Sequence, residues 1–133
     1  MTKLDGIREK VFLDRYALKG KKGELLEHKP EEMWKRVANG IAQSEKSAKR
    51  KFWQKKFYQV MEDFKFVPGG RILSGAGTKY QVTYFNCFVI PSPKDSRGGI
   101  VDSLKQLIEI QSRSGGVGLN LSSLRPRGAR VKK

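Results

Sequence analysis

The sequence contains a single cysteine, Cys87, and a thiol can donate electrons to another group by becoming part of a disulfide. Because the chain has no second cysteine, Cys87 cannot form an intrachain disulfide, and the sequence favours a reducing environment. Taken alone, a free cysteine is more often a small buried hydrophobic residue than a reactive thiol. Any redox role for Cys87 therefore requires a partner thiol from elsewhere.

A glycine cluster at residues 115–118, GGVG, could let the backbone approach a sugar or a phosphate closely. The cluster is not a phosphate-binding P-loop, because no Lys-Ser or Lys-Thr pair follows it and GxGxxG spacing is not met. Taken alone, it is more often the end of a helix followed by a tight turn. Both interpretations stay open at this point.

Basic residues dominate the composition, with 28 Lys and Arg against 13 Asp and Glu and a net charge of +15. Such an excess favours nucleic acid, nucleotides or an acidic protein surface as partners. Residues 46–56 interleave lysines with Phe52 and Trp53, as nucleic-acid-binding patches do, but these aromatic residues fall on the packing stripe of a predicted helix. We therefore favour a solvated helix face. The isolated His28 has no metal-ligand partners and is assigned no chemistry.

The first part of the chain is predicted to be helical. Residues 4–18 indicate a short helix that the basic segment 19–23 ends, and Pro30 begins an amphipathic helix. Residues 47–64 predict a further helix, and the glycine-rich segment 68–77 predicts a loop with a short apolar insert. The predicted apolar stripes are Met33, Trp34, Val37 and Ile41 in one helix and Trp53, Phe57, Val60, Met61 and Phe64 in the other.

The second part predicts a strand, a helix and a short strand. Residues 82–90 are rich in β-branched and aromatic side chains, which is typical of a buried strand, with Cys87 inside it. A helix capped by Asp95 or Ser96 follows and ends at the glycines. Its predicted buried stripe comprises Ile100, Leu104, Leu107, Ile108 and Gln111. No segment offers about 18 consecutive apolar residues, so we expect a cytoplasmic protein without membrane association.

Six segments, read in order, resemble the adenosylcobalamin-dependent (class II) ribonucleotide reductases: VFLDRYAL, MWKRVANGIA, FVPGGRILSGAGT, VTYFNCFVIP, DSRGGI and SGGVGLNLSSLRPRGARV. The resemblance extends over nearly the whole chain and depends on the order and spacing of these motifs. It implies an α/β fold, present here as an α+β fragment. Residues 1–80 would form the helical N-terminal region, and residues 81–133 would begin a ten-stranded α/β barrel.

The resemblance implies that Cys87 is one of two thiols that reduce the ribose of a ribonucleoside diphosphate or triphosphate in deoxyribonucleotide synthesis. Asn86, Gly115 and Gly116 match residues that contact the substrate, and Gly70 is a weaker candidate. A second set matches the site of the deoxynucleoside triphosphate effector at the dimer contact: Asp95, Ser96, Arg97 and Arg125.

The resemblance also implies partners. Adenosylcobalamin would supply the radical, a thioredoxin-type protein would supply electrons, and the complete enzyme would be a homodimer. The radical cysteine, the redox partner of Cys87, the catalytic Asn and Glu and a C-terminal cysteine pair are not matched in these 133 residues, nor is an ATP-binding cone domain. We therefore expect a fragment, a split-gene product or an intein-interrupted segment that needs the remainder of the reductase chain, which would bind most of the cofactor.

The alternative is a non-catalytic basic module that binds a nucleotide or nucleic acid, or a decayed remnant. Salt separates these possibilities, because binding to a polyanion weakens steeply as salt rises and ignores base identity. An effector site should instead prefer particular deoxynucleoside triphosphates.

Overall fold

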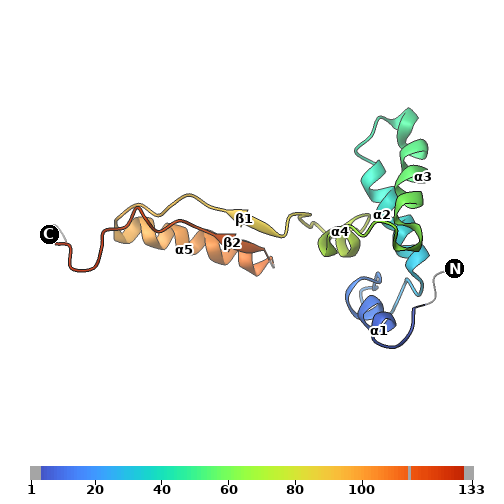
Figure 1. Ribbon diagram of the computed structural model, residues 1–133, viewed down its shortest axis with the longest axis horizontal. Helices are drawn as coiled ribbons and strands as arrows, with labels where there is room; N and C mark the ends of the chain where they lie inside the picture. The colour runs from blue at the N-terminus through green and yellow to red at the C-terminus, as the bar shows by residue number, and fades with distance from the viewer. Residues whose placement is uncertain (1–3, 114, 131–133) are drawn as a thin grey trace. The chain divides into compact units, whose positions relative to one another are not determined.

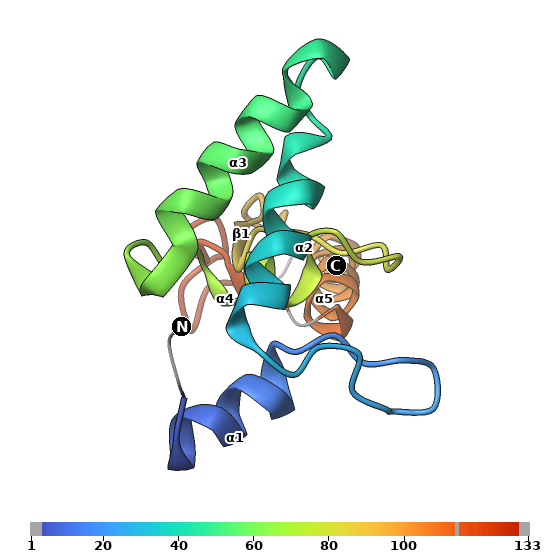
Figure 2. The same ribbon diagram turned by 90° about the vertical axis from the view of Figure 1, so that its right-hand side faces the viewer.

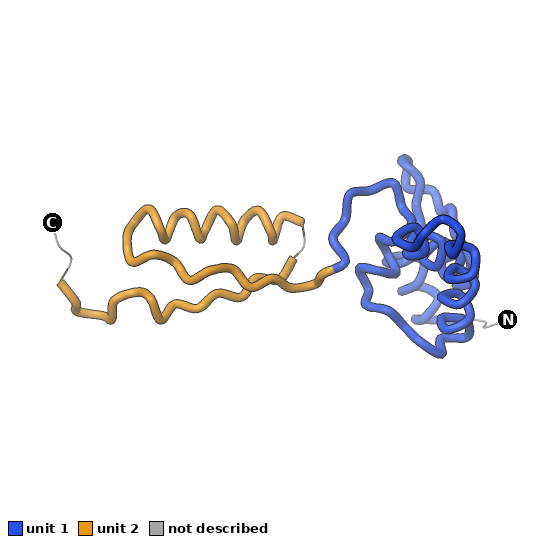
Figure 3. Tube along the Cα trace, turned by 90° about the horizontal axis from the view of Figure 1, so that it is seen from above, with its two compact units in different colours: residues 1–84 blue, residues 85–133 orange. Residues whose placement is uncertain are grey.

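The chain folds into two compact units, residues 1–84 and residues 85–133, in a computed structural model that describes residues 4–113 and 115–130 (Figures 1 and 3). The first unit contains the helices α1 (Gly6–Arg15), α2 (Pro30–Ala42), α3 (Arg50–Met61) and α4 (Gly70–Gly75), with short 3-10 turns at Ser47–Lys49 and Glu62–Phe64. The second contains β1 (Cys87–Val89), α5 (Arg97–Ser112) and β2 (Gly116–Gly118). The predicted order, a helical region followed by strand, helix and strand, is confirmed.

The core of the first unit lies around α2, which packs along α3 (Figure 2). Trp34 is 2% exposed and meets the ring of Phe64 edge-on at a centroid distance of 5.0 Å. Met33 and Val37 are also buried on this face of α2, and Ile41 is partly buried against the core. The predicted apolar stripe of this helix is therefore confirmed. Pro30 occupies the first turn, where its missing N–H group has no helical acceptor to lose.

The start of α2 is capped by a carboxylate. Glu32 accepts hydrogen bonds from the backbone N–H groups of His28, at 2.6 Å, and Lys29, at 3.0 Å. These bonds favour the charged form, and the hydrogen bond from His28 makes the largest contribution to holding the pKa of Glu32 below its usual range. The side chain thus satisfies backbone donors that have no partner inside the helix.

The segment 68–77 is not the predicted loop, because residues 70–75 form α4. Leu73 is buried in the core, and this tertiary packing overrides the low helix propensity of the flanking glycines. The segment after α4 passes close to α2 at Gly40. A Cβ atom at Gly40 would collide with the backbone of Gly77, whose φ is +73°. The two glycines allow a backbone contact that no larger side chain permits.

A buried ion pair joins three parts of the first unit. The Arg36 guanidinium donates to the Glu27 carboxylate from Nε, at 2.7 Å, and from Nη2, at 3.0 Å. It also donates to the backbone carbonyls of Tyr16, Leu73 and Ala76, at 3.2, 3.0 and 2.7 Å. Glu27 accepts a further bond from the Leu18 N–H at 2.9 Å. The Arg36 and Glu27 side chains are only 8% and 6% exposed, so this network holds α2, α4 and the segment after α1 together.

The second unit is a βαβ arrangement in which β1 and β2 pair in parallel and α5 connects them. The predicted strand over residues 82–90 is shorter, only Cys87–Val89, and it is not buried: Val89 is 90% exposed. The predicted buried stripe of α5 is also wrong, because Ile100, Leu104, Ile108 and Gln111 are exposed and Leu107 is half-buried. A sheet of two strands with one helix offers too few neighbours to cover these side chains.

The bounds of one further helix differ from the prediction, since α3 begins at Arg50 and ends at Met61. Residues 47–64 do not form one continuous helix, because α3 ends at Met61. Beyond that end, Asp63 and Phe64 both have positive φ.

None of the helices formed by residues 4–113 and 115–130 is long and apolar enough to cross a membrane.

Candidate functional site

Cys87 begins β1 and lies opposite Gly116 of β2 in the parallel register. Cys87 is exposed. A Cβ atom placed on Gly116 would lie 3.1 Å from the Sγ atom of Cys87. The Gly116 N–H donates to the Asn86 carbonyl at 2.8 Å, which fixes the two strands at this point. The missing side chain at Gly116 therefore leaves one flank of the thiol open.

The structure thus brings together Asn86, Cys87, Gly115 and Gly116, which the sequence predicted as substrate residues. Gly115 has a structural reason of its own to lack a side chain: a Cβ atom there would lie 2.6 Å from Cγ2 of Ile110 at the end of α5. The helix-stop interpretation therefore applies to Gly115, whereas a side chain at Gly116 would lie in close contact with the thiol. An exposed thiol on a hydrogen-bonded strand is accessible to a reaction partner and held in position by its backbone.

The second predicted cluster lies at the opposite end of α5. Ser96 caps this helix, and its Oγ accepts a hydrogen bond from the Gly99 N–H at 3.0 Å. Nε of Arg125 lies 2.9 Å from Oδ2 of Asp95, and its Nη2 donates to the Asp95 carbonyl at 3.2 Å. Arg97 is the first residue of α5. All four predicted effector residues therefore meet at a helix start, where free N–H groups favour anions.

Hydrogen bonds between segments about 30 residues apart in the sequence hold Arg125 at the start of α5. The Ser123 Oγ donates to the Pro93 carbonyl at 2.6 Å, and Nη1 of Arg125 donates to the Arg130 carbonyl at 3.3 Å. The Asp95 and Arg125 side chains stay 36% and 33% exposed, so an anion from solvent can reach the guanidinium. Gly116, which pairs with Cys87, follows the other end of α5. The 16 residues of this helix give it a length of about 24 Å.

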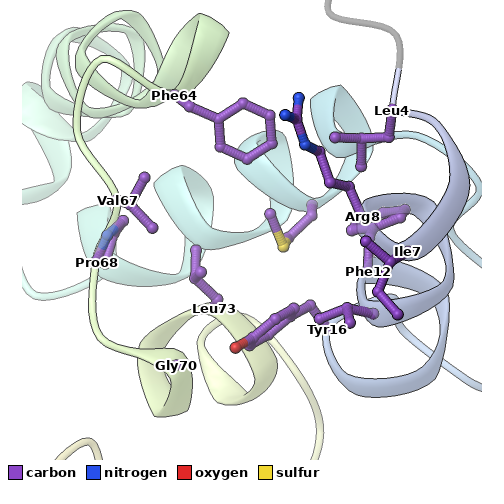
Figure 4. Close-up of a pocket in the computed structure, with 12 residues that line it drawn as sticks. Leu4, Ile7, Arg8, Phe12, Tyr16, Phe64, Val67, Pro68, Gly70 and Leu73 are labelled. Carbon is purple, nitrogen blue, oxygen red and sulfur yellow. The ribbon is translucent and has the colours of Figure 1, made fainter.

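Gly70 does not lie in the unit that carries Cys87. It lines an apolar pocket of about 500 Å³ in the first unit, where a Cβ atom would lie 3.5 Å from the Tyr16 hydroxyl oxygen (Figure 4). The walls of this pocket are mainly the side chains of α1 and of the segment around Val67 and Pro68, with the Arg8 guanidinium near Phe64. Within the first unit, Gly70 therefore has a packing environment.

Two sets of residues were missed by sequence reasoning. The buried Arg36–Glu27 network has no local signal, because its partners are spread over residues 16–76. Lys35 of α2 also escaped notice, although it lines a hollow with Lys51 and Lys55 of α3. Among residues 4–113 and 115–130, no three His, Cys, Asp or Glu side chains lie close enough together to hold a metal ion.

Comparison with known proteins gives two domain matches. Residues 3–81 match the family described as "Ribonucleotide reductase, all-alpha domain", and residues 85–133 match "Ribonucleotide reductase, barrel domain". A vitamin B12-dependent ribonucleoside-diphosphate reductase of Mycobacterium tuberculosis is 33% identical over 124 residues, which cover 91% of this chain and 18% of the relative.

Two further relatives do not carry the B12-dependent name. The ribonucleoside-diphosphate reductase large chain 2 of Saccharomyces cerevisiae is 33% identical over 119 residues, covering 90% of this chain and 13% of the relative. The ribonucleoside-diphosphate reductase subunit alpha of Helicobacter pylori is 29% identical over 123 residues, covering 92% and 15%. This chain thus spans less than a fifth of each relative's length. The match of both domains along the chain shows that it belongs to the ribonucleotide reductase family.

Proposed function

We propose that this chain supplies the N-terminal segment of a reductase that converts ribonucleoside diphosphates, or triphosphates, to deoxyribonucleotides, with Cys87 as one of the two substrate-reducing thiols. The pairing of Cys87 with Gly116 carries the proposal, because it leaves an exposed thiol on a fixed strand with open space beside it. In domain terms, residues 1–80 would be the helical region and residues 81–133 the start of the barrel.

The chemistry requires two electrons and two protons. The ribose 2′-hydroxyl leaves as water and hydrogen takes its place at carbon 2′, which consumes two electrons and two protons. Two thiols release two electrons and two protons when they join as a disulfide. Cys87 provides one thiol, and the second must come from the remainder of the reductase chain. A disulfide needs the two Cα atoms within about 7 Å, so the assembled barrel must bring the partner strand to Cys87.

Substrate contacts would come from the same strand ends. The Asn86 side chain precedes the thiol, and the missing side chain of Gly116 leaves room for a ribose and its phosphates, while Gly115 would contact the substrate through its backbone. Gly70 is proposed only as a weaker candidate, since its neighbours in the structure are apolar.

The cluster at the start of α5 is proposed to bind a deoxynucleoside triphosphate effector. Asp95 can accept a hydrogen bond from the deoxyribose 3′-hydroxyl, while the helix start, with Ser96 and Arg97, favours negative charge. Arg125 can bind phosphate oxygens with two parallel N–H groups. Because Arg125 is paired with Asp95 in the structure, the effector phosphates would compete with this carboxylate for the guanidinium.

We further propose the class II type of reductase, in which adenosylcobalamin provides the radical when bound. We expect the remainder of the reductase chain to bind most of this cofactor. The remaining proposed properties are a homodimer, a thioredoxin-type reductant and a cytoplasmic location.

Reconstitution tests the proposal. The chain should be co-expressed with the barrel segment that completes it, and deoxyribonucleotide formation measured with adenosylcobalamin and a thioredoxin system. Cys87→Ser should abolish turnover and leave effector affinity almost unchanged, because the thiol and the effector cluster lie at opposite ends of α5. Ser92→Ala, on the exposed segment between them, is the matched control. Full turnover by Cys87→Ser with the physiological reductant would refute the redox role.

A further inference from the structure

The helices α2 and α3 frame a hollow of about 340 Å³ that is lined by three lysines, Lys35, Lys51 and Lys55. Gln54 and Tyr58 also line it, and each carries a side-chain hydrogen-bond donor. The remaining lining residue is Ala38, which is fully buried and too small to fill the space. All three lysines are exposed, so their flexible side chains can bring ammonium groups to an anion in the hollow.

The three lysines place like charges along one hollow. Lys51 and Lys55 are four residues apart on α3, a spacing that places like charges on one helix face and destabilises the helix. Lys35 adds a third charge from α2. None of the ion pairs formed by the described residues includes any of these lysines. An anion in the hollow would relieve the repulsion among them.

Acidic residues follow one end of the row of lysines. Glu31 lies one helical turn before Lys35 on α2, and Glu62 and Asp63 follow the end of α3, four and five residues after Tyr58. Burial and the negative charges of these residues raise the pKa of the Tyr58 hydroxyl, in agreement with this placement. A long nucleic-acid strand that followed the lysines would approach these carboxylates and be repelled, whereas a short phosphate chain can stay among the lysines.

We propose that this hollow binds a linear oligophosphate, the chemistry that a nucleoside triphosphate and inorganic tripolyphosphate share. Lysine binds phosphate as a compact point charge with three donors, and the amide of Gln54 and the hydroxyl of Tyr58 can donate to the remaining phosphate oxygens. The site belongs to the helical unit and is independent of the reductase function proposed for Cys87, so either proposal can fail alone.

The test is calorimetric titration of the whole chain with inorganic tripolyphosphate at about 50 mM and about 200 mM salt. The site variant is Lys35→Gln/Lys51→Gln/Lys55→Gln, and the matched control neutralises three other exposed lysines, Lys10, Lys21 and Lys22. Both lower the net charge from +15 to +12 by removing three positive charges. We expect a binding event that weakens about tenfold or more in the site variant and less than about threefold in the control, whereas any binding at the start of α5 persists in both variants.

Three further measurements keep the result decisive. Tyr58→Phe removes one donor and keeps the ring that packs against Trp34, so affinity should fall a few-fold with the fold retained. ATP that binds at least as tightly as tripolyphosphate would identify a nucleotide as the source, and weaker ATP would identify inorganic oligophosphate. Equal loss in the two triple variants would overturn the proposal, because net charge alone would then explain binding. Tighter binding of a thymidine oligonucleotide at about 200 mM salt would also overturn it and assign the surface to nucleic acid.

Discussion

Arg36→Ala should destabilise the helical unit more than any surface substitution, because it breaks a buried ion pair from one side. The Glu27 carboxylate is left in a site that is 6% exposed, with one remaining hydrogen bond, from the Leu18 N–H. The carbonyls of Tyr16, Leu73 and Ala76 lose a charged donor at the same time. A buried charge without its partner is among the most unfavourable groups in a folded protein.

The magnitude follows from the burial of the pair. Removing one partner of a buried ion pair costs about 3–5 kcal/mol, whereas an exposed pair contributes about 0–1 kcal/mol. Native proteins have total stabilities of about 5–15 kcal/mol, so Arg36→Ala should remove a large part of the folding free energy of residues 1–84. Arg36→Lys should recover part of the loss, since an ammonium restores the charge but lacks the planar set of donors.

Urea unfolding followed by tryptophan fluorescence measures the change, because Trp34 is buried beside the network on α2. The matched control is Arg15→Ala, at the exposed end of α1, which should change the free energy of unfolding by less than about 0.5 kcal/mol. The double variant Glu27→Gln/Arg36→Ala should be more stable than Arg36→Ala alone, since it no longer buries an unpaired carboxylate. If Arg36→Ala unfolds within about 1 kcal/mol of the control, the network does not hold the unit together.

Three further substitutions test other parts of the structure. Gly40→Ala should lower the free energy of unfolding by about 1–3 kcal/mol, because its methyl group would collide with the backbone of Gly77; urea unfolding would show no change if the contact were absent. Glu32→Gln should cost about 0.5–1 kcal/mol at neutral pH. Its pKa lies below the usual 4.5 in the folded chain, so its stabilising effect is present above that value and disappears as pH falls through the lowered pKa. The difference between wild type and Glu32→Gln should therefore shrink in acid-range unfolding curves, and a pH-independent difference would contradict this. Gly116→Ala should slow the reaction of Cys87 with a thiol reagent a few-fold, because the added Cβ would lie 3.1 Å from Sγ; an unchanged rate would show that the flank is not the route of access.

The parts of the fold that follow from local sequence were predictable. Pro30 and the spacing of Met33, Trp34 and Val37 fix the start and the buried face of α2 from neighbours within four residues. The helix α4 was not predictable, because Leu73 is helical on account of core contacts with residues far away in the sequence. The burial of β1 was overestimated for a related reason: a run of apolar side chains indicates a buried strand only if enough neighbours cover it.

The candidate site was predictable to a similar extent. Motif order along the chain identified Cys87 and the glycines, and Asp95 with Ser96 fitted a helix cap, but only the parallel register shows that Gly116 faces the thiol. No local pattern indicates that Arg125 returns to Asp95, since the pair spans 30 residues of sequence. The three lysines of the hollow lie on two helices, and helical periodicity alone groups only Lys51 with Lys55.

The Arg36 network also sets an order of events during synthesis. The guanidinium on α2 has acceptors 20 residues before it, at Tyr16, and 40 residues after it, at Ala76. A nascent chain that has emerged only as far as α3 can pair Arg36 with Glu27, but the guanidinium then lacks its acceptors at Leu73 and Ala76. Cooperative closure of the unit must therefore wait until residue 76 has left the ribosome, and N-terminal domains generally fold as units during synthesis.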